Sequence, residues 1–328
     1  MKAYGGHAGA RHKYRNSFEF DEYGLREGND DDTSMDLDIP SILAAKIDTL
    51  PSLPAVVTQV IQTIASPKST VEDLNRIISS DVSLTATILK VANSAFFGFS
   101  RKVSSLEQAL KLLGFAEVQN LILTKAVFNS FKNTKNNGKF DIRRFWEHAF
   151  LCGLAARLLG KTAGIKGADL FVAGLIHDIG KLVLYTVLPA QFSEILEMAG
   201  TIDSMTSNAE RSLIGYAHDK VGMDLLQRWM FPKNLVTAVG FHHRPKETTE
   251  HTLLATLVYL ADLMAHFATQ WEASEGEPLV KKELLHPDTV ALCRSQGLEW
   301  NGPVCGRVLK ELFESKEAEW PTISVFFS

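Results

Sequence analysis

Apolar residues recur at spacings of three and four from Leu37 onward, a period that helices satisfy and strands do not. No convincing run of the alternating strand pattern occurs. Cap residues punctuate the helical runs: Asp81 and Ser104 or Ser105 can cap the helices that follow them, and Gly114 ends one. The sequence therefore predicts an all-α, multi-helix fold.

The same pattern divides the chain into four segments. Residues 1–36 are rich in glycine, asparagine and charge, and we expect a disordered tail. Residues 37–135 form an N-terminal helical lobe, and its boundary at 135 lies within the stretch Lys132–Gly138, which has no apolar residue. Residues 136–270 form a second helical lobe, and residues 271–328 a C-terminal helical extension.

Composition narrows the class of protein. Of 328 residues 45% are hydrophobic, so a large core can form, and the net charge of −4 argues against a whole-protein nucleic-acid surface. Three cysteines without a C-x-x-C pair indicate a reducing compartment. No apolar leader opens the chain and no apolar stretch is long enough for a membrane span, so we expect a cytoplasmic protein without a membrane partner.

Two helices carry charged or polar residues where an apolar residue is expected. Asp262 lies in the middle of 252–268, which is apolar almost all round. His177 and Asp178 interrupt the apolar run 170–185, where adjacent helical positions point about 100° apart and can reach one ion. A buried carboxylate without a partner costs several kcal/mol, so these groups must be paired or bound to metal.

Further histidines share this apolar helical setting: His148, His218, His242 and His243. Imidazole and carboxylate without thiolate suit a divalent transition metal, Fe, Mn, Zn, Co or Ni, as one ion or two. The alternative is that each of the seven groups has its own hydrogen-bond or salt-bridge partner. Single helices are expected over 168–188 and 207–230, with Gly174 and Gly180 allowing close backbone approach beside the histidine–aspartate pair.

The motif His177–Lys181, H-D-I-G-K, resembles the HD superfamily of metal-dependent phosphohydrolases. The order of the other residues resembles the ligand set of the HD-GYP phosphodiesterases. The resemblance implies seven metal ligands, Fe or Mn favoured, with Asp178 bridging two ions. The implied ligands are His148, His177, Asp178, His218, His242, His243 and Asp262.

Motifs across 41–270 resemble the HDOD domain, the HD-related output domain of bacterial signalling. They include L-P-S-L-P, L-K-V-A-N-S-A-F-F-G and F-H-H-R-P. The resemblance implies an HD-type domain with an N-terminal lobe and a regulatory or sensing role, with an unidentified signalling protein as partner. No G-Y-P sequence follows His242–His243, although it would be expected of a cyclic-di-GMP phosphodiesterase, and Gly215–Tyr216 is interpreted as ordinary helix.

Two other functions stay open. In an active phosphohydrolase on a nucleotide or cyclic dinucleotide, Asp178 and Lys181 would be catalytic, and Lys181 and Arg244 would bind the phosphate. A metal-independent module would bind protein or nucleic acid through basic side chains, although a solvated linker is favoured for these residues and nucleic acid is not expected. That basic stretch consists of Lys132, Lys135, Lys139, Arg143 and Arg144.

Overall fold

The computed structural model describes residues 42–323 except for 44, 47–49, 51, 67, 94–96, 135–139, 166, 168, 200–202, 271–281 and 283. The chain divides into two compact units, Met1–Leu37 and Asp38–Ser328, and every described residue belongs to the second. The tail expected over 1–36 lies outside the described residues. The expected division of the remainder at 135 and 270 stays a prediction.

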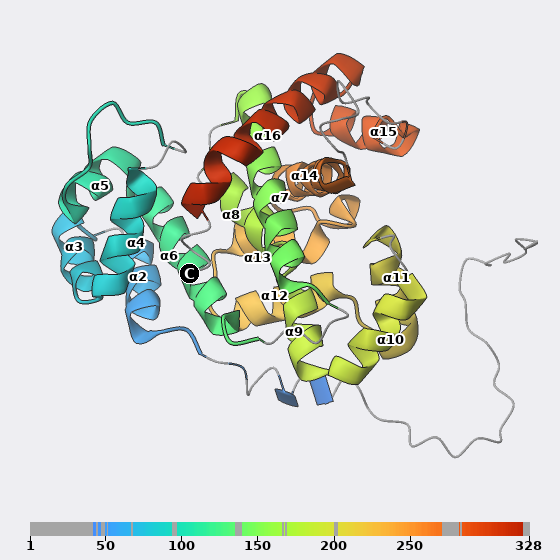
Figure 1. The fold of residues 1–328 in the computed structure, drawn as a ribbon, viewed down its shortest axis with the longest axis horizontal. Coiled ribbons are helices and arrows are strands. Elements are labelled where there is room, and N and C mark those ends of the chain that lie inside the picture. The colour runs from blue at the N-terminus through green and yellow to red at the C-terminus, as the bar shows by residue number, and fades with distance from the viewer. Residues whose placement is uncertain are drawn as a thin grey trace, which may run out of the picture. The chain divides into compact units, whose positions relative to one another are not determined.

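All regular elements in the described residues are helical, as the period of the sequence predicted (Figure 1). The first group of helices comprises α2 (Ala55–Ala65), α3 (Val71–Ser79), α4 (Val82–Ala92), α5 (Leu106–Leu113) and α6 (Phe115–Phe131). The second comprises α7 (Ile142–Thr162), α8 (Asp169–Ile176), α9 (Ile179–Val187), α10 (Pro189–Ala199), α11 (Asp203–Ile214), α12 (His218–Arg228), α13 (Lys233–Phe241), the 3-10 turn η1 (Pro245–Glu247) and α14 (Thr252–Gln270). The chain ends with α15 (Pro287–Ser295) and α16 (Gly302–Ile323).

Local chemistry explains several helix ends. The Asp81 side chain accepts a hydrogen bond from the Leu84 amide at 2.9 Å, and the Ser105 hydroxyl accepts one from Gln108 at 3.1 Å. Gly114 separates α5 from α6 with a φ of +84°, a region that an L side chain rarely adopts. The caps expected at Asp81 and Ser105 and the stop at Gly114 are confirmed.

Two expected helices are each broken in the structure. The run expected over 168–188 ends at Ile176 and resumes at Ile179, so His177 and Asp178 lie in a turn instead of on one helical edge. The run expected over 207–230 breaks between α11 and α12, where Gly215 has a φ of +75°. The interpretation of Gly215–Tyr216 as ordinary helix is therefore wrong, because apolar periodicity continues across both breaks and cannot reveal them.

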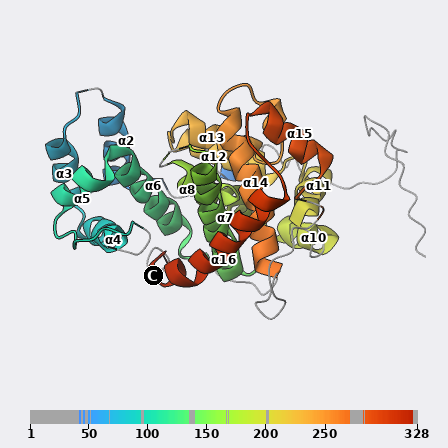
Figure 2. The ribbon, with the colours of Figure 1, turned by 90° about the horizontal axis from the view of Figure 1, so that it is seen from above.

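The core is built around α7, which packs against α8, α14 and α16 (Figures 1 and 2). Helix α6 of the N-terminal group packs against α8, and so joins its own helices to that core. Contrary to the expectation that no apolar stretch is long enough for a membrane span, Asp169–Val187 is long and apolar enough by length and composition, but 94% of its 18-residue apolar window is buried inside the protein. Its apolar character is accounted for by its place in the core.

Candidate metal centre

The seven histidines and aspartates singled out by the sequence meet in two adjoining groups. Within each group, one ligand atom per residue lies within 4.8 Å of the others. We call Asp178, His218, His242 and His243 the four-donor group. We call His148, His177 and Asp262 the three-donor group. Metal ligands are brought together in this way from helices far apart in the sequence.

Most of these side chains occupy helix ends. His177 follows α8 and Asp178 precedes α9, while His218 is the first residue of α12. His242 and His243 follow α13 directly. His148 and Asp262 instead lie within the long helices α7 and α14, which pack against each other. A turn gives a side chain more freedom of direction than the middle of a helix, so the breaks between α8 and α9 and between α11 and α12 let these side chains point toward one another.

Three imidazoles are held by their Nδ1 atoms. His177 Nδ1 lies 2.7 Å from the Gly174 carbonyl, and His242 Nδ1 lies 2.7 Å from the Val239 carbonyl. His218 Nδ1 lies 2.6 Å from Glu210 Oε2. A carbonyl or carboxylate oxygen only accepts, so each Nδ1–H donates and each neutral ring keeps an Nε2 lone pair. This is the orientation in which histidine binds a metal through Nε2.

Asp178 lies between the two groups. Its Oδ1 lies 3.1 Å from His218 Nε2 in the four-donor group, and its Oδ2 lies 3.4 Å from His177 Nε2 in the three-donor group. Lys181 donates a hydrogen bond to Oδ2 at 2.7 Å. A carboxylate with one oxygen toward each group has the arrangement of a bridging ligand.

The three-donor group contains a close carboxylate contact. Asp262 Oδ1 lies 3.0 Å from His148 Nε2 and 3.4 Å from His177 Nε2. His266, one turn further along α14, stacks on His148 with ring centroids 4.4 Å apart, and its Nε2 lies 3.3 Å from Asp262 Oδ1. The aspartate is therefore surrounded by three imidazoles.

Several buried polar atoms make no hydrogen bond of good geometry among the described residues, notably His177 Nε2, His242 Nε2 and Asp178 Oδ1, although the first and last have an oppositely charged atom within 3.4 Å. Buried polar atoms are nearly always satisfied, so these atoms call for a partner that the protein chain does not provide. His218 Nε2 and His243 Nε2 face each other at 2.9 Å. Two nitrogens bound to one ion at about 2.1 Å lie roughly 3 to 3.4 Å apart, so a divalent ion fits this donor set.

Electrostatics differ within the cluster. Burial lowers the pKa of His218, but the carboxylates of Glu210 and Asp178 raise it to about 9. Burial and the charge on His177 instead lower the pKa of His242 to about 4. Burial raises the pKa of Asp178, yet His177, foremost among its cationic neighbours, brings it well below the ordinary value. The cluster thus combines an ionised Asp178 and a neutral His242 with a protonated His218, whose Nε2 proton a bound metal would displace.

Two glycines set the helix spacing at the cluster. A Cβ on Gly180 would lie 1.9 Å from the His218 carbonyl oxygen, which α12 brings against α9. A Cβ on Gly174 would lie 2.6 Å from the Cys152 carbonyl oxygen, where α7 meets α8. The close backbone approach expected at both positions is confirmed, because any side chain would force the helices apart.

The residues expected to bind phosphate are held by carboxylates. Arg244 donates to Asp219 Oδ2 at 3.0 Å and to Glu247 Oε2 at 2.7 Å. Arg211 donates to the same Asp219 oxygen at 3.1 Å. Lys181 is buried against Asp178, so it lies beside the cluster as expected. The phosphate role of Lys181 and Arg244 stays a prediction.

Sequence reasoning missed three residues around the cluster: Glu210, Asp219 and His266. Glu210 is fully buried, and both the amide and Nδ1 of His218 donate to its Oε2. Like Asp262, Glu210 could have been recognised as a carboxylate on the apolar side of a helix. The surrounding sequence N-A-E-R-S is mostly polar, however, and is typical of a solvent-exposed helix. In the basic stretch, Arg143 pairs with Glu147 and Arg144 lies near Asp141, while Lys135 and Lys139 lie outside the described residues.

The fold and the site together define an all-helical domain built around a buried histidine–aspartate cluster that could hold a metal ion. The HDOD domain model matches residues 50–245, more than half of the chain, and the chain belongs to the HDOD family. The family resemblance of the sequence is thereby confirmed.

The chain is also similar to several individual proteins. An uncharacterised protein of Treponema pallidum is 27% identical over 69% of this chain and 44% of its own length, and YuxH of Bacillus subtilis is 25% identical over 63% and 48%. The chain thus spans about half the length of these curated relatives. An HDOD domain protein of unknown function from Geobacter sulfurreducens shares the fold, with a TM-score of 0.67, 23% identity and coverage of 87% of this chain and 97% of that one.

A candidate phosphohydrolase from Shewanella amazonensis shares the fold as well. Its TM-score is 0.66, its identity is 24%, and the match covers 86% of this chain and 98% of that one. At this identity the likeness establishes the fold alone.

Proposed function

We propose that this chain is a cytoplasmic signalling module that holds one or two divalent transition-metal ions, Fe or Mn first, and that the metal state governs its contact with a signalling protein. The observation that carries the proposal is the donor set: seven imidazole and carboxylate ligands, three with Nδ1 anchored and Nε2 directed inward. The four-donor group would hold one ion and the three-donor group a second.

A hydrogen-bonded route links the cluster to the N-terminal helices. The Asp169 carboxylate accepts from Asn120 of α6 at 3.0 Å and from Asn234 of α13 at 2.6 Å. Asp169 begins α8, which ends beside His177, and Asn234 lies near the start of α13, which ends at His242. A shift of these ligands on metal binding would bear on α6 through rigid helices, which supports a regulatory output.

Burial also favours a module over an enzyme. His177, His218 and His242 each have 0% exposure, and Asp178 has 2%. A substrate phosphate has to reach the metal ligands, whereas an ion that only stabilises or senses does not. The ion, once bound, contributes charge neutralisation and cross-links the helices that supply its ligands.

Metal analysis of protein purified without oxygen tests the proposal. We expect at least one equivalent of Fe or Mn in the native chain and a loss of most of it in His177→Ala. His286→Asn is the matched control, because His286 is exposed and caps α15, a role that asparagine can fill. Absence of metal at any stoichiometry, in Fe- and Mn-supplemented medium, would contradict the proposal.

The regulatory step has its own measurement. Hydrogen exchange of the α6 amides is expected to slow when metal is added to chelated protein, and Asn120→Ala should abolish this difference while leaving the bound metal in place. Equal exchange with and without metal would leave a structural metal site and contradict the signalling role.

A second candidate is metal-dependent phosphohydrolysis. The complete donor set, with Lys181 beside Asp178, favours it. A bound divalent ion would lower the pKa of water and polarise a phosphoryl oxygen, and Lys181 would neutralise phosphate charge. Turnover of cyclic dinucleotides or nucleotides with Mn²⁺ or Fe²⁺, lost in Asp178→Ala, would support this function, and bound metal without turnover would support the module.

A further inference from the structure

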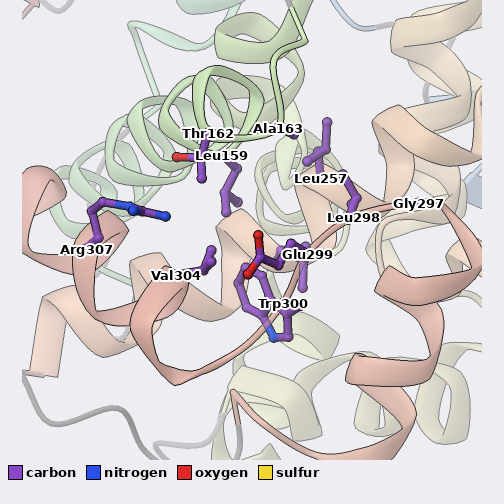
Figure 3. Close-up of a pocket in the computed structure, with 11 residues that line it drawn as sticks. Leu159, Thr162, Ala163, Leu257, Gly297, Leu298, Glu299, Trp300, Val304 and Arg307 are labelled. Atoms are coloured by element: carbon purple, nitrogen blue, oxygen red, sulfur yellow. The ribbon is translucent and has the colours of Figure 1, made fainter.

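A second feature lies away from the metal cluster, where the C-terminal extension meets the core. The end of α7, the middle of α14, the turn 297–300 and the start of α16 enclose a cavity of about 220 Å³ (Figure 3). That is below the roughly 300–1,000 Å³ of pockets for drug-sized ligands. It suits a molecule the size of an amino acid.

Apolar side chains that are themselves buried form much of the cavity wall: Leu159, Leu257, Leu260, Trp300 and Val304. Because the rest of the protein holds these side chains in place, the apolar surface exists before any ligand arrives. An apolar group placed there would gain about 25 cal/mol for each Å² removed from water.

The turn that closes the cavity is rigidly built. Gly297 adopts a φ of +69° after α15, and the Leu298 amide donates to the Cys293 carbonyl at 2.9 Å. Trp300 donates its Nε1–H to the Leu284 carbonyl at 2.7 Å, which fixes its ring against the cavity. The turn therefore presents Glu299, which lies between Leu298 and Trp300, in a defined direction.

Two opposite charges face this cavity. Figure 3 shows the Glu299 carboxylate and the Arg307 guanidinium pointing into the same space, from the turn and from α16. Within the described part of the chain no ion pair joins either of them to another residue, and only Asn301 donates to Glu299, at 2.9 Å. An ammonium and a carboxylate on adjacent positions of one ligand would complement both charges.

We propose that this cavity binds a free apolar α-amino acid, such as leucine or phenylalanine. Arg307 pairs with its carboxylate, Glu299 accepts from its ammonium, and its side chain lies on Leu159, Leu260 and Val304. The site differs from the metal centre and requires no metal, so it stands or falls independently of the function proposed above.

The cavity lies between helices that also carry residues of the metal cluster. Leu260 lies two residues from Asp262 on α14, and Leu159 lies on the helix α7 that carries His148. The ligand would therefore contact both helices of the three-donor group, and would also hold the C-terminal extension to them.

Calorimetric titration of the full chain with L-leucine and L-phenylalanine tests the proposal. We expect a Kd between about 10 µM and 1 mM for at least one of them. L-leucinamide lacks the carboxylate and 4-methylpentanoate lacks the ammonium, so each is expected to bind at least about tenfold more weakly than leucine. No binding of either amino acid up to about 10 mM, or equal binding of leucinamide, would overturn the proposal.

Substitutions locate the site. Arg307→Gln and Glu299→Gln should each weaken binding at least about tenfold, and Ala163→Trp should fill the cavity from its exposed rim and abolish binding. Arg294→Gln is the control, because Arg294 is an exposed arginine of α15 outside the cavity. Unchanged affinity in Arg307→Gln would place any observed binding elsewhere and refute the site, and this variant removes no buried contact that folding needs.

Discussion

The four-donor and three-donor groups adjoin at Asp178 in the core but are supported differently. In the four-donor group, His218 and His242 are fixed through Nδ1 by Glu210 and the Val239 carbonyl. In the three-donor group, His177 is fixed in the same way by the Gly174 carbonyl, but His148 points its Nε2 directly at Asp262 at 3.0 Å. An imidazole anchored through Nδ1 reorganises little on binding an ion, and the four-donor group has two such imidazoles against one in the three-donor group. We infer that the four-donor group binds its ion more tightly.

Exposure does not follow the same division. His218 and His242 are fully buried but His243 of the four-donor group is partly exposed. In the three-donor group His177 is fully buried, and His148 and Asp262 are 8% and 7% exposed. Each group therefore combines fully buried donors with donors nearer the surface, so the ranking of the two groups rests on the anchored imidazoles and not on burial.

The largest difference is expected between Asp178→Asn and Asp262→Asn. Because Asp178 contacts both groups, its substitution should remove more than about nine-tenths of the bound metal, a loss of affinity of at least about 100-fold. Asp262→Asn should leave the ion of the four-donor group in place. Metal content after gel filtration distinguishes them, and a greater loss in Asp262→Asn would reverse the ranking of the two groups.

The helix spacing offers a second contrast. Gly180→Ala puts a Cβ 1.9 Å from the His218 carbonyl oxygen, so the free energy of unfolding should fall by about 3 kcal/mol or more. Gly174→Ala, at 2.6 Å from the Cys152 carbonyl oxygen, should cost about 1–3 kcal/mol. Urea unfolding of chelated protein measures both.

Gly302→Ala is the control for these two substitutions. A Cβ there meets only the Leu285 side chain at 4.0 Å, and its effect should stay below about 1 kcal/mol. Equal free energies of unfolding for Gly180→Ala and Gly302→Ala would show that α9 and α12 can move apart at little cost, and would contradict the prediction.

Glu210 allows a test by pH. In chelated protein the pKa of His218, about 9, lies above its ordinary value of 6.5, so the stabilising charge is fully present below about pH 6.5 and is lost as the pH rises through 9. The Tm should therefore fall over that interval, and Glu210→Gln should flatten the fall because it removes the main carboxylate that raises the pKa. The exposed Glu194→Gln should keep the native slope, and a slope unchanged in Glu210→Gln would assign the decline to another group.

His266 is expected to give the smallest effect. Its ring stacks on His148 at 4.4 Å, so His266→Gln should weaken metal binding at the three-donor group about threefold and leave the four-donor group unchanged. Chelator competition resolves the two affinities. A loss of tenfold or more would make His266 a ligand rather than a neighbour.

The sequence by itself determined the helical class and the residues of the cluster. Apolar periodicity needs only the positions of apolar side chains, and buried polar residues such as Asp262 stand out against it. The close backbone approach at Gly174 and Gly180, beside the histidine–aspartate pair, could also be predicted from the sequence, because glycine alone has no side chain to prevent it.

Only the tertiary structure decided the rest. The breaks at His177–Asp178 and Gly215 are set by packing among α8, α9, α11 and α12, since apolar spacing runs through both without interruption. The division into two groups, the support of His218 by Glu210 and the charged cavity at Glu299 and Arg307 depend on distances between helices remote in the chain. A one-dimensional pattern records which side chains are buried but not which of them meet.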